Sequence, residues 1–272
     1  MTAPLIRLDG VSVRFGKQEV LRDLTLEIFA NRTLVVIGES GCGKSVTLKL
    51  IVGLLKPTSG EVYFEGAPLS RMRDAELTAM RKRVGFLFQQ AALFDSLTVE
   101  ANVAFGLQAH GGLTALAIRE RVAERLREVG LPVGVEGKMP AELSGGMKKR
   151  VGLARALALN PDVMLYDEPT TGLDPIMTDV INELILLTRS RRPVTSLIVT
   201  HEMRTVHKVA DRVVMLYPLA RLEAGESQIL YDGPPQKLLT SLNPRVRQFV
   251  EGEARDRLSE MRMESESAEM GS

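Results

Sequence analysis

Eight consecutive residues, Gly38-Glu39-Ser40-Gly41-Cys42-Gly43-Lys44-Ser45, combine glycines, a lysine and a serine at a spacing suited to phosphate binding. Glycines let backbone N–H groups approach oxygen atoms without a clash from a Cβ atom. Lys44 supplies a mobile positive charge for β- and γ-phosphates, and the Ser45 hydroxyl can ligate Mg²⁺. The segment follows the apolar run 34–37 and opens a helix-like stretch from Val46 to Leu55, as a phosphate-binding loop requires. The sequence therefore predicts a site for a polyphosphate.

Two carboxylates end another apolar run, further along the chain. Asp167 and Glu168 directly follow Val163-Met164-Leu165-Tyr166. An acid that ends a buried strand of a phosphate-loop enzyme can hold Mg²⁺, and Asp167 suits this role. Glu168 beside it can orient and deprotonate an attacking water, which contributes roughly 10²–10⁴-fold to a rate. The pair predicts hydrolysis of the bound polyphosphate.

Two more strand ends carry polar side chains. The apolar run 84–88 ends at Gln89, and the run 196–200 ends at His201. Polar groups at the carboxyl ends of strands face the ligand crevice in open α/β sheets. An imidazole there can donate a hydrogen bond to a terminal phosphate. We therefore expect both side chains beside the phosphate loop.

Two other segments leave a functional and a structural interpretation open. Ser144, in Leu143-Ser144-Gly145-Gly146-Met147, can cap a helix whose first N–H groups then remain available to an anion. An ordinary helix start uses the same residue types. Phe15 ends an early strand, where its ring can stack on a nucleotide base or belong to the core.

The pattern around these motifs is that of strands interrupted by helices. Alternation predicts antiparallel strands over 5–15 and 19–28, before the phosphate loop. From Thr98 to Leu159 the pattern becomes helical, which predicts an inserted helical segment. Its Arg- and Glu-rich part, 119–128, is expected to be a solvent-exposed helix face. The tail from Glu251 has no sustained apolar stripe and is expected to be disordered.

The composition limits the other classes of function. The 272 residues are 44% hydrophobic, enough for a substantial core. A net charge of +1, 4% aromatic residues and no Trp argue against nucleic acid as a partner. The single cysteine, Cys42, cannot form an intrachain disulfide. The sequence has no signal-peptide pattern and no run of 18 apolar residues, so we expect any membrane role to come through a partner.

Together these motifs resemble the ATP-binding subunit of an ABC transporter over roughly residues 4–242. The matching segments, in the family's order, are 38–45 (Walker A), Gln89 (Q-loop), 143–146 (signature), 163–168 (Walker B with the catalytic glutamate), 172–174 (D-loop) and His201 (H-loop). The resemblance implies an α/β, P-loop NTPase fold of the ABC ATPase type. A mixed or parallel core sheet, an antiparallel β subdomain and a helical subdomain over about 95–159 belong to it. We expect a nucleotide-binding domain over 1–242 and a C-terminal, partner-contacting extension over 243–272.

The resemblance also implies ATP and Mg²⁺ as cofactors. It assigns catalysis to Glu168, His201 and Gln89, and metal binding to Ser45, Gln89 and Asp167. Nucleotide contacts fall on Phe15, Gly38, Glu39, Ser40, Gly41, Cys42, Gly43, Lys44, Ser45, Val46, Ser144, Gly145, Gly146 and Asp174. Two copies would meet head to tail, and each ATP would lie between one copy's Walker A loop and the other's signature. ATP would then join the dimer, and hydrolysis would loosen it.

A closer resemblance is to the ATPase of Mla-type phospholipid transporters, through residues 86–104, 147–150 and 243–252. Such systems pair the ATPase with a permease and an MCE-domain lipid carrier, and a small STAS-domain protein can bind nearby. The resemblance implies a peripheral ATPase on the cytoplasmic face of the inner (plasma) membrane, with the permease docked near 91–103. Two alternatives stay open: an ATPase for a small polar solute importer, and a soluble ABC protein that acts on nucleic acid or ribosomes.

The sequence departs from the family pattern at two places. Met147 replaces the glutamine that usually ends the signature, and Glu202 follows His201 where aspartate is also common. Neither change is expected to prevent ATP hydrolysis. The stretch 217–228 is longer than the usual hairpin, so we expect regulation or partner contacts at that edge to differ.

Overall fold

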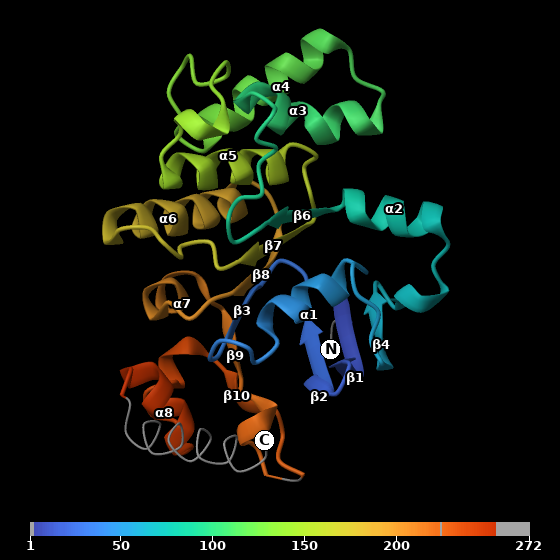
Figure 1. The fold of residues 1–272 in the computed structure, drawn as a ribbon, viewed down its shortest axis with the longest axis vertical. Coiled ribbons are helices and arrows are strands. Elements are labelled where there is room, and N and C mark those ends of the chain that lie inside the picture. Colours follow the sequence, from blue (N-terminus) through green and yellow to red (C-terminus); the bar gives the residue numbers. More distant parts are fainter. Residues whose placement is uncertain (1–2, 224, 254–272) are drawn as a thin grey trace, which may run out of the picture.

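Two β-sheets and a set of helices build the fold in the computed structural model, which describes residues 3–223 and 225–253 (Figure 1). The larger sheet has the order β10-β9-β3-β8-β7-β6. Its neighbouring strands pair in parallel except β9 and β10, which are antiparallel. The strands are β3 (Thr33–Ile37), β6 (Val84–Leu87), β7 (Val163–Asp167), β8 (Thr195–Val199), β9 (Arg212–Leu216) and β10 (Ile229–Gly233). The predicted mixed core sheet is thereby confirmed.

The smaller sheet is antiparallel and has the order β2-β1-β4-β5. Its strands are β1 (Ile6–Phe15), β2 (Gln18–Ile28), β4 (Ser59–Phe64) and β5 (Ala67–Pro68). β1 covers all but the first residue of the predicted region 5–15, with a register shift between Leu8 and Val11 against β2. A bulge keeps both halves of the strand paired although the alternation changes phase.

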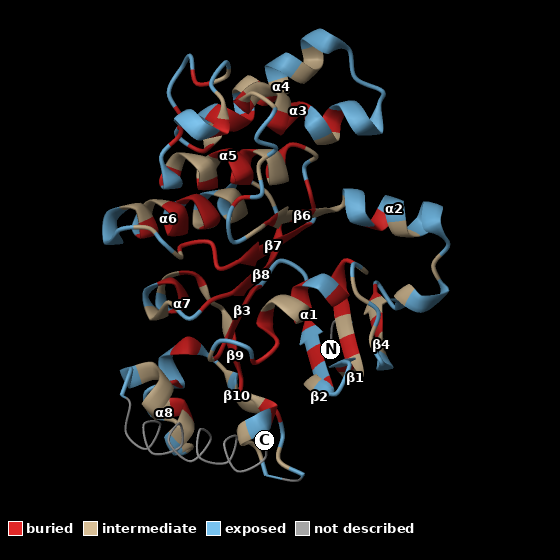
Figure 2. Cartoon of the chain, in the orientation of Figure 1, coloured by how far each residue is buried: buried red, intermediate tan, exposed pale blue. Residues whose placement is uncertain are grey.

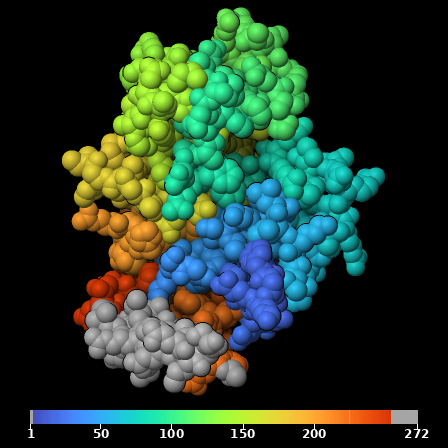
Figure 3. Space-filling model, viewed as in Figure 1, coloured from blue at the N-terminus to red at the C-terminus, as the bar shows by residue number. Residues whose placement is uncertain are grey.

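The helices of the core lie against these sheets (Figure 1). They are α1 (Lys44–Ile51), α2 (Asp74–Lys82), α6 (Pro175–Arg191), α7 (Met203–Val209) and α8 (Pro244–Glu251), with short 3₁₀ turns η1 (Leu69–Arg71), η2 (Pro140–Glu142), η3 (Leu219–Arg221) and η4 (Pro235–Lys237). The helical insertion consists of α3 (Val99–His110), α4 (Ala115–Glu128) and α5 (Gly145–Leu157). It forms the green lobe at the top of the molecule in Figure 3.

The central strands are buried on both faces, as Figure 2 shows. Every residue of β3, β7 and β8 is buried. Val35 and Ile37 belong to a hydrophobic cluster with the helical insertion, and Leu34 and Val36 belong to a second cluster with the antiparallel sheet. Because side chains alternate along a strand, the continuous apolar run of β3 supplies both clusters. The strand that leads into the phosphate loop is therefore held rigidly from both sides.

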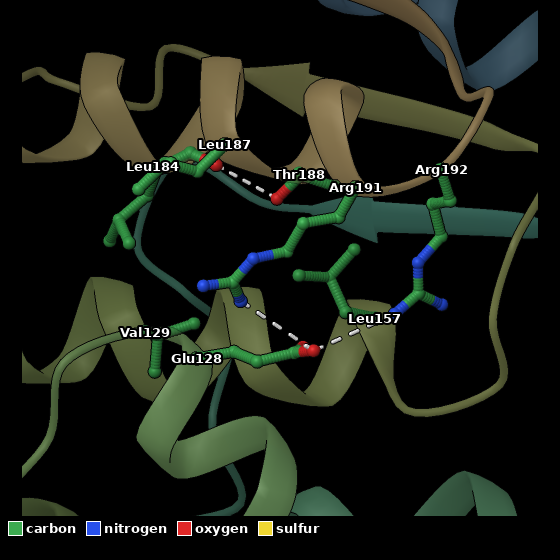
Figure 4. A pocket seen from close by; sticks show the side chains of 8 residues that line it. All are labelled: Glu128, Val129, Leu157, Leu184, Leu187, Thr188, Arg191 and Arg192. Carbon is green, nitrogen blue, oxygen red and sulfur yellow. Dashed lines mark hydrogen bonds and ion pairs between the residues drawn. The ribbon is translucent and has the colours of Figure 1, made fainter.

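A charged residue of α4 is buried, so the prediction of a solvent-exposed face over 119–128 is wrong for Arg125. Arg125 is only 2% exposed, and its guanidinium bonds to Glu128 and to Oδ1 of Asn160, the latter at 2.8 Å. Glu128 also lies 3.7 Å from Arg191 and 3.8 Å from Arg192, at the end of α6 (Figure 4). Asn160, Arg191 and Arg192 lie outside α4, so the pattern of that helix does not reveal them. The cluster ties the helical insertion to the core.

The start of the C-terminal segment packs on the rest of the chain. α8 follows residue 243, and its Val246 is fully buried in the main hydrophobic cluster. Residues 254–272, for which disorder is expected, lie outside the described residues. The division into a domain over 1–242 and an extension over 243–272 stays a prediction.

Candidate active site

The phosphate loop joins β3 to α1, and two of its glycines have backbone positions that exclude a side chain. Gly43, just before α1, has φ +100°, and a Cβ atom there would lie 2.4 Å from a side-chain carbon of Leu21. Gly38 has φ +148°, and its Cβ would lie 2.2 Å from the carbonyl oxygen of Leu216. The curve of the loop therefore depends on glycine at both positions.

Lys44 folds back over this loop. Its side chain is 8% exposed, and its Nζ donates hydrogen bonds to the carbonyl oxygens of Gly38 at 2.8 Å and Glu39 at 3.0 Å. Nζ also lies 3.9 Å from Oε1 of Glu168. The ammonium group is thus placed beside the loop amides and the start of α1, where an anion is stabilised.

Ser45 and Asp167 meet although they lie 122 positions apart in the sequence. The Ser45 hydroxyl donates a hydrogen bond of 2.7 Å to Oδ1 of Asp167, the last residue of β7. Burial raises the pKa of the Asp167 carboxyl above its usual value, and the hydrogen bond from Ser45 opposes that rise. A hydroxyl and a carboxylate oxygen side by side are hard ligands of the kind that Mg²⁺ prefers.

Glu168 is oriented by donors from three segments. Nδ1 of His201 lies 2.9 Å from its Oε2, and the Thr171 hydroxyl donates to the same oxygen at 3.1 Å. Lys44 approaches the other oxygen. The backbone of Glu168 has φ +47°, and its N–H bonds to the Val199 carbonyl at 2.9 Å. An uncommon backbone conformation held by several partners is typical of functional positions.

An open hollow of about 330 Å³ lies over the loop. Its lining residues come from β2, the phosphate loop, α1 and two strand ends: Gln18, Val20, Ser40, Gly41, Gly43, Lys44, Ser45, Val46, Gln89 and Glu168. Phe15 pairs with Gln18 in the β1–β2 hairpin and is 48% exposed. Cys42 is buried in the loop, and this burial raises the pKa of its thiol. The fold therefore gathers most of the predicted site residues from five segments at one edge of the sheet.

None of the predicted signature and D-loop residues belongs to the described lining of this hollow. The Ser144 hydroxyl accepts a hydrogen bond from the Met147 N–H at 3.3 Å and caps α5. Asp174 caps α6 by accepting from the Ile176 and Met177 N–H groups, each at 2.9 Å. Within one chain, these two side chains act as helix caps.

Lys149 was not predicted, although it connects three motifs. It lies on α5, is 5% exposed, and donates from Nζ to the carbonyl oxygens of Gln89 and Glu168. Burial lowers the pKa of its ammonium group to about 8. A signal exists in the sequence, because Gly146, Lys149 and Gly152 recur every three residues on the buried face of α5.

We expect Lys149→Met to lower kcat by about thirtyfold, since two hydrogen bonds of about 1 kcal/mol each are lost at the backbone of Gln89 and Glu168. Methionine is similar in length to lysine, and Lys149 does not line the hollow over the loop. The affinity for ATP should therefore stay within about twofold of the wild-type value. Steady-state phosphate release and ATP titration measure both quantities. Lys148→Met is the matched control for the loss of one charge on α5. An unchanged kcat, or an equal loss in the control, would contradict this role.

Comparison with protein families decides what kind of site this is. Residues 21–171 match the family model of the ABC transporter. That range runs from β2 through the phosphate loop, Gln89 and Ser144 to both terminal acids of β7. The chain belongs to the ABC transporter ATP-binding family. This ABC transporter ATPase therefore binds and hydrolyses ATP, as its sequence predicted.

Relatives and solved structures agree with this assignment. The probable ribonucleotide transport ATP-binding protein mkl of Mycobacterium leprae is 41% identical over 247 residues, covering 91% of this chain and 69% of that protein. The intermembrane phospholipid transport system ATP-binding protein MlaF of Escherichia coli K12 is 37% identical over 250 residues, covering 92% of this chain and 90% of MlaF. The dimeric post-hydrolysis structure of the ATP-binding cassette MJ0796 with ADP and Pi has a TM-score of 0.74 and 31% identity, covering 85% of this chain and 98% of that one.

These matches confirm the predicted ABC ATPase fold, the ATPase activity and the resemblance to Mla-type ATPases. In the described parts of the chain, no helix is both long and apolar enough to cross a membrane. The same parts contain no group of three or more His, Cys, Asp or Glu side chains arranged to hold a metal ion.

Proposed function

We propose that this ABC ATPase powers phospholipid or lipid transport through a membrane permease, together with an MCE-type lipid carrier. The observation that carries the proposal is the similarity to MlaF of Haemophilus influenzae and Escherichia coli, which spans at least 90% of both chains in each pair. MlaF is named an intermembrane phospholipid transport system ATP-binding protein in both organisms. The match therefore extends over most of each chain and not over the ATPase motifs alone.

In the proposed hydrolysis, Glu168 is the general base. Its carboxylate takes the proton of the attacking water, while Thr171 and His201 hold Oε2 in place at 3.1 and 2.9 Å. The side chain of His201 is 59% exposed, so its imidazole can also donate to the terminal phosphate. Lys44 offsets the negative charge of the β- and γ-phosphates. Gln89, exposed at the hollow, orients the water.

We assign Mg²⁺ to Ser45 and Asp167, with Gln89 contacting it from the facing strand end. The donor set fits, since the hydroxyl and carboxylate oxygens are 2.7 Å apart and the carboxylate is buried. Mg²⁺ is commonly held by one or two such groups plus phosphate oxygens and waters. When bound, it would offset the charge on the phosphate oxygens.

The dimer is proposed to complete each site. Ser144, Gly145, Gly146 and Asp174 lie outside the lining of their own chain's hollow, which supports their use by a second copy. The first N–H groups of a helix have no partner within it, so the start of α5 can contact a γ-phosphate. The similar cassette MJ0796 is dimeric with ADP and Pi bound.

We place the ATPase on the cytoplasmic face of the inner membrane, held there by the permease. The proposed docking surface lies near residues 91–103. There Phe94, 42% exposed, packs against the 46% exposed Phe105, with the two rings tilted and their centres 4.6 Å apart. Exposed neighbouring aromatic side chains are typical of protein contacts. A small STAS-domain protein is a further proposed partner, whereas nucleic acid is not.

A transporter of a small polar solute is the second candidate. The observation in its favour is the name of the Mycobacterium leprae relative, a probable ribonucleotide transport protein. The two candidates differ in the partners and cargo that they bind.

Affinity purification of the full-length tagged protein from membranes tests the proposal. We expect a permease, an MCE-domain protein and bound phospholipid to copurify. A Phe105→Asp variant is the control, and it should lose all three while retaining ATP binding. A solute-binding protein without phospholipid would contradict lipid transport, and strong salt-sensitive RNA binding would contradict transport altogether.

A further inference from the structure

The long segment between β9 and β10 reaches back to the phosphate loop. Arg221, at the end of η3, donates from Nη1 to Oε1 of Glu39 at 2.5 Å. The side chain of Arg221 is 10% exposed, and that of Glu39 is 32% exposed. The carbonyl of Glu39 also accepts a hydrogen bond from Lys44. The ion pair therefore holds Glu39, whose carbonyl contacts Lys44, in place. The guanidinium of Arg221 also offsets the negative charge of the Glu39 carboxylate beside the predicted triphosphate site.

Gln228, at the other end of the same segment, contacts the loop a second time. It is 3% exposed, and its Nε2 donates to the carbonyl oxygens of Cys42 at 3.1 Å and Val20 at 3.0 Å. Its Oε1 accepts from the Arg22 N–H at 3.1 Å. A buried amide whose donor and acceptor are all used fixes its neighbours firmly. The loop is thereby attached to both β2 and the 217–228 segment.

The C-terminal helix holds this segment from outside. Tyr217 is 3% exposed, with the guanidinium carbons of Arg221 and Arg245 at 4.7 and 5.1 Å from its ring centre. Arg245, on α8, also lies 3.0 Å from Glu226. Hydrogen bonds from the Glu223 N–H and from Arg245 lower the pKa of the Glu226 carboxyl. α8 lies against the edge of the sheet formed by β9 and β10 (Figure 1).

We propose that residues 217–223 and 225–228 are a clamp on the phosphate loop, and that α8 sets this clamp, so that the position of the C-terminal helix tunes nucleotide affinity. The proposal rests on nucleotide binding at the Lys44 loop. Arg221 acts as a positioning residue, because it contacts Glu39 and does not line the hollow over the loop. A loop held in its binding shape before ATP arrives loses less freedom on binding.

By thermodynamic linkage, the effect of α8 on nucleotide binding equals the effect of nucleotide on α8 docking. If α8 raises the affinity for nucleotide, bound nucleotide must stabilise the docked α8 by the same free energy. A partner that displaces α8 would then release nucleotide, which connects the C-terminal extension to the ATPase cycle. This regulation concerns an edge where the sequence is longer than the usual hairpin of the family.

Affinity measurements with a fluorescent ATP analogue on the full-length protein test the clamp. We expect Arg221→Met to raise Kd by about tenfold, the effect of one charge-assisted hydrogen bond, and Arg245→Met to raise it by about threefold. Arg221→Lys keeps the charge and should recover part of the loss. The value of kcat at saturating ATP should stay within about twofold in each variant. Arg212→Met is the matched control, because Arg212 pairs with Asp232 at the opposite end of β9 and should leave Kd unchanged.

Hydrogen exchange supplies the second readout. Saturating ATP should slow amide exchange in α8 of the wild type by about the same factor by which Arg245→Met raises Kd. An unchanged Kd in Arg221→Met, or an α8 exchange rate that ATP leaves unaltered, would overturn the clamp. A wild type that fails to bind ATP would instead overturn nucleotide binding itself. If Arg221→Met fails to fold, the Kd of Arg245→Met and the hydrogen-exchange experiment still test the clamp.

Discussion

Glu168→Gln is expected to lower ATP turnover by at least about 10²-fold while ATP binding persists. Glutamine has the shape of glutamate, so it can keep the contacts with Thr171 and His201, but its amide cannot accept the proton of the attacking water. Because binding continues without hydrolysis, an ATP-bound dimer should accumulate. Phosphate release, ATP titration and size-exclusion chromatography with ATP measure the three effects.

The control for this substitution is Glu183→Gln. Glu183 is a surface residue of α6 that pairs with Lys208, so its loss should leave turnover within about twofold. Normal turnover in Glu168→Gln would remove this residue from the role of base. A loss of ATP binding would show instead that the carboxylate serves the nucleotide.

Lys44→Ala should abolish most nucleotide binding, with Kd for ATP raised by at least about 10²-fold. The substitution removes the buried ammonium group that bonds to the Gly38 and Glu39 carbonyls and faces the phosphates. ATP titration measures the change, and thermal unfolding without nucleotide checks that the variant is folded.

Lys49→Ala gives the matched comparison. Lys49 is an exposed lysine of the same helix, one turn beyond the loop. The Lys49→Ala substitution should therefore change Kd for ATP by no more than about threefold. Equal losses in both variants would indicate a general effect of positive charge, and normal affinity in Lys44→Ala would refute the assigned loop. Together with Glu168→Gln, this pair separates binding from hydrolysis.

The sequence by itself determined the phosphate loop, the acids at the end of β7 and the polar residues after β6 and β8. Each of these is a short local pattern: an apolar run predicts a buried strand, and the residue types directly after it predict the chemistry at its end. Ser45 and Asp167 are 122 positions apart, yet both could be predicted because parallel strands bring their carboxyl ends to one edge.

Only the tertiary structure decided which polar groups support those residues. Arg221 reaches Glu39 across 182 positions, and Gln228 reaches Cys42 across 186. Lys149 is buried on a helix face by strand ends from other parts of the chain. Long polar side chains look alike in a local pattern whether they face water or the interior. Their partners are chosen by packing between distant elements, and that choice exists only once the chain is folded.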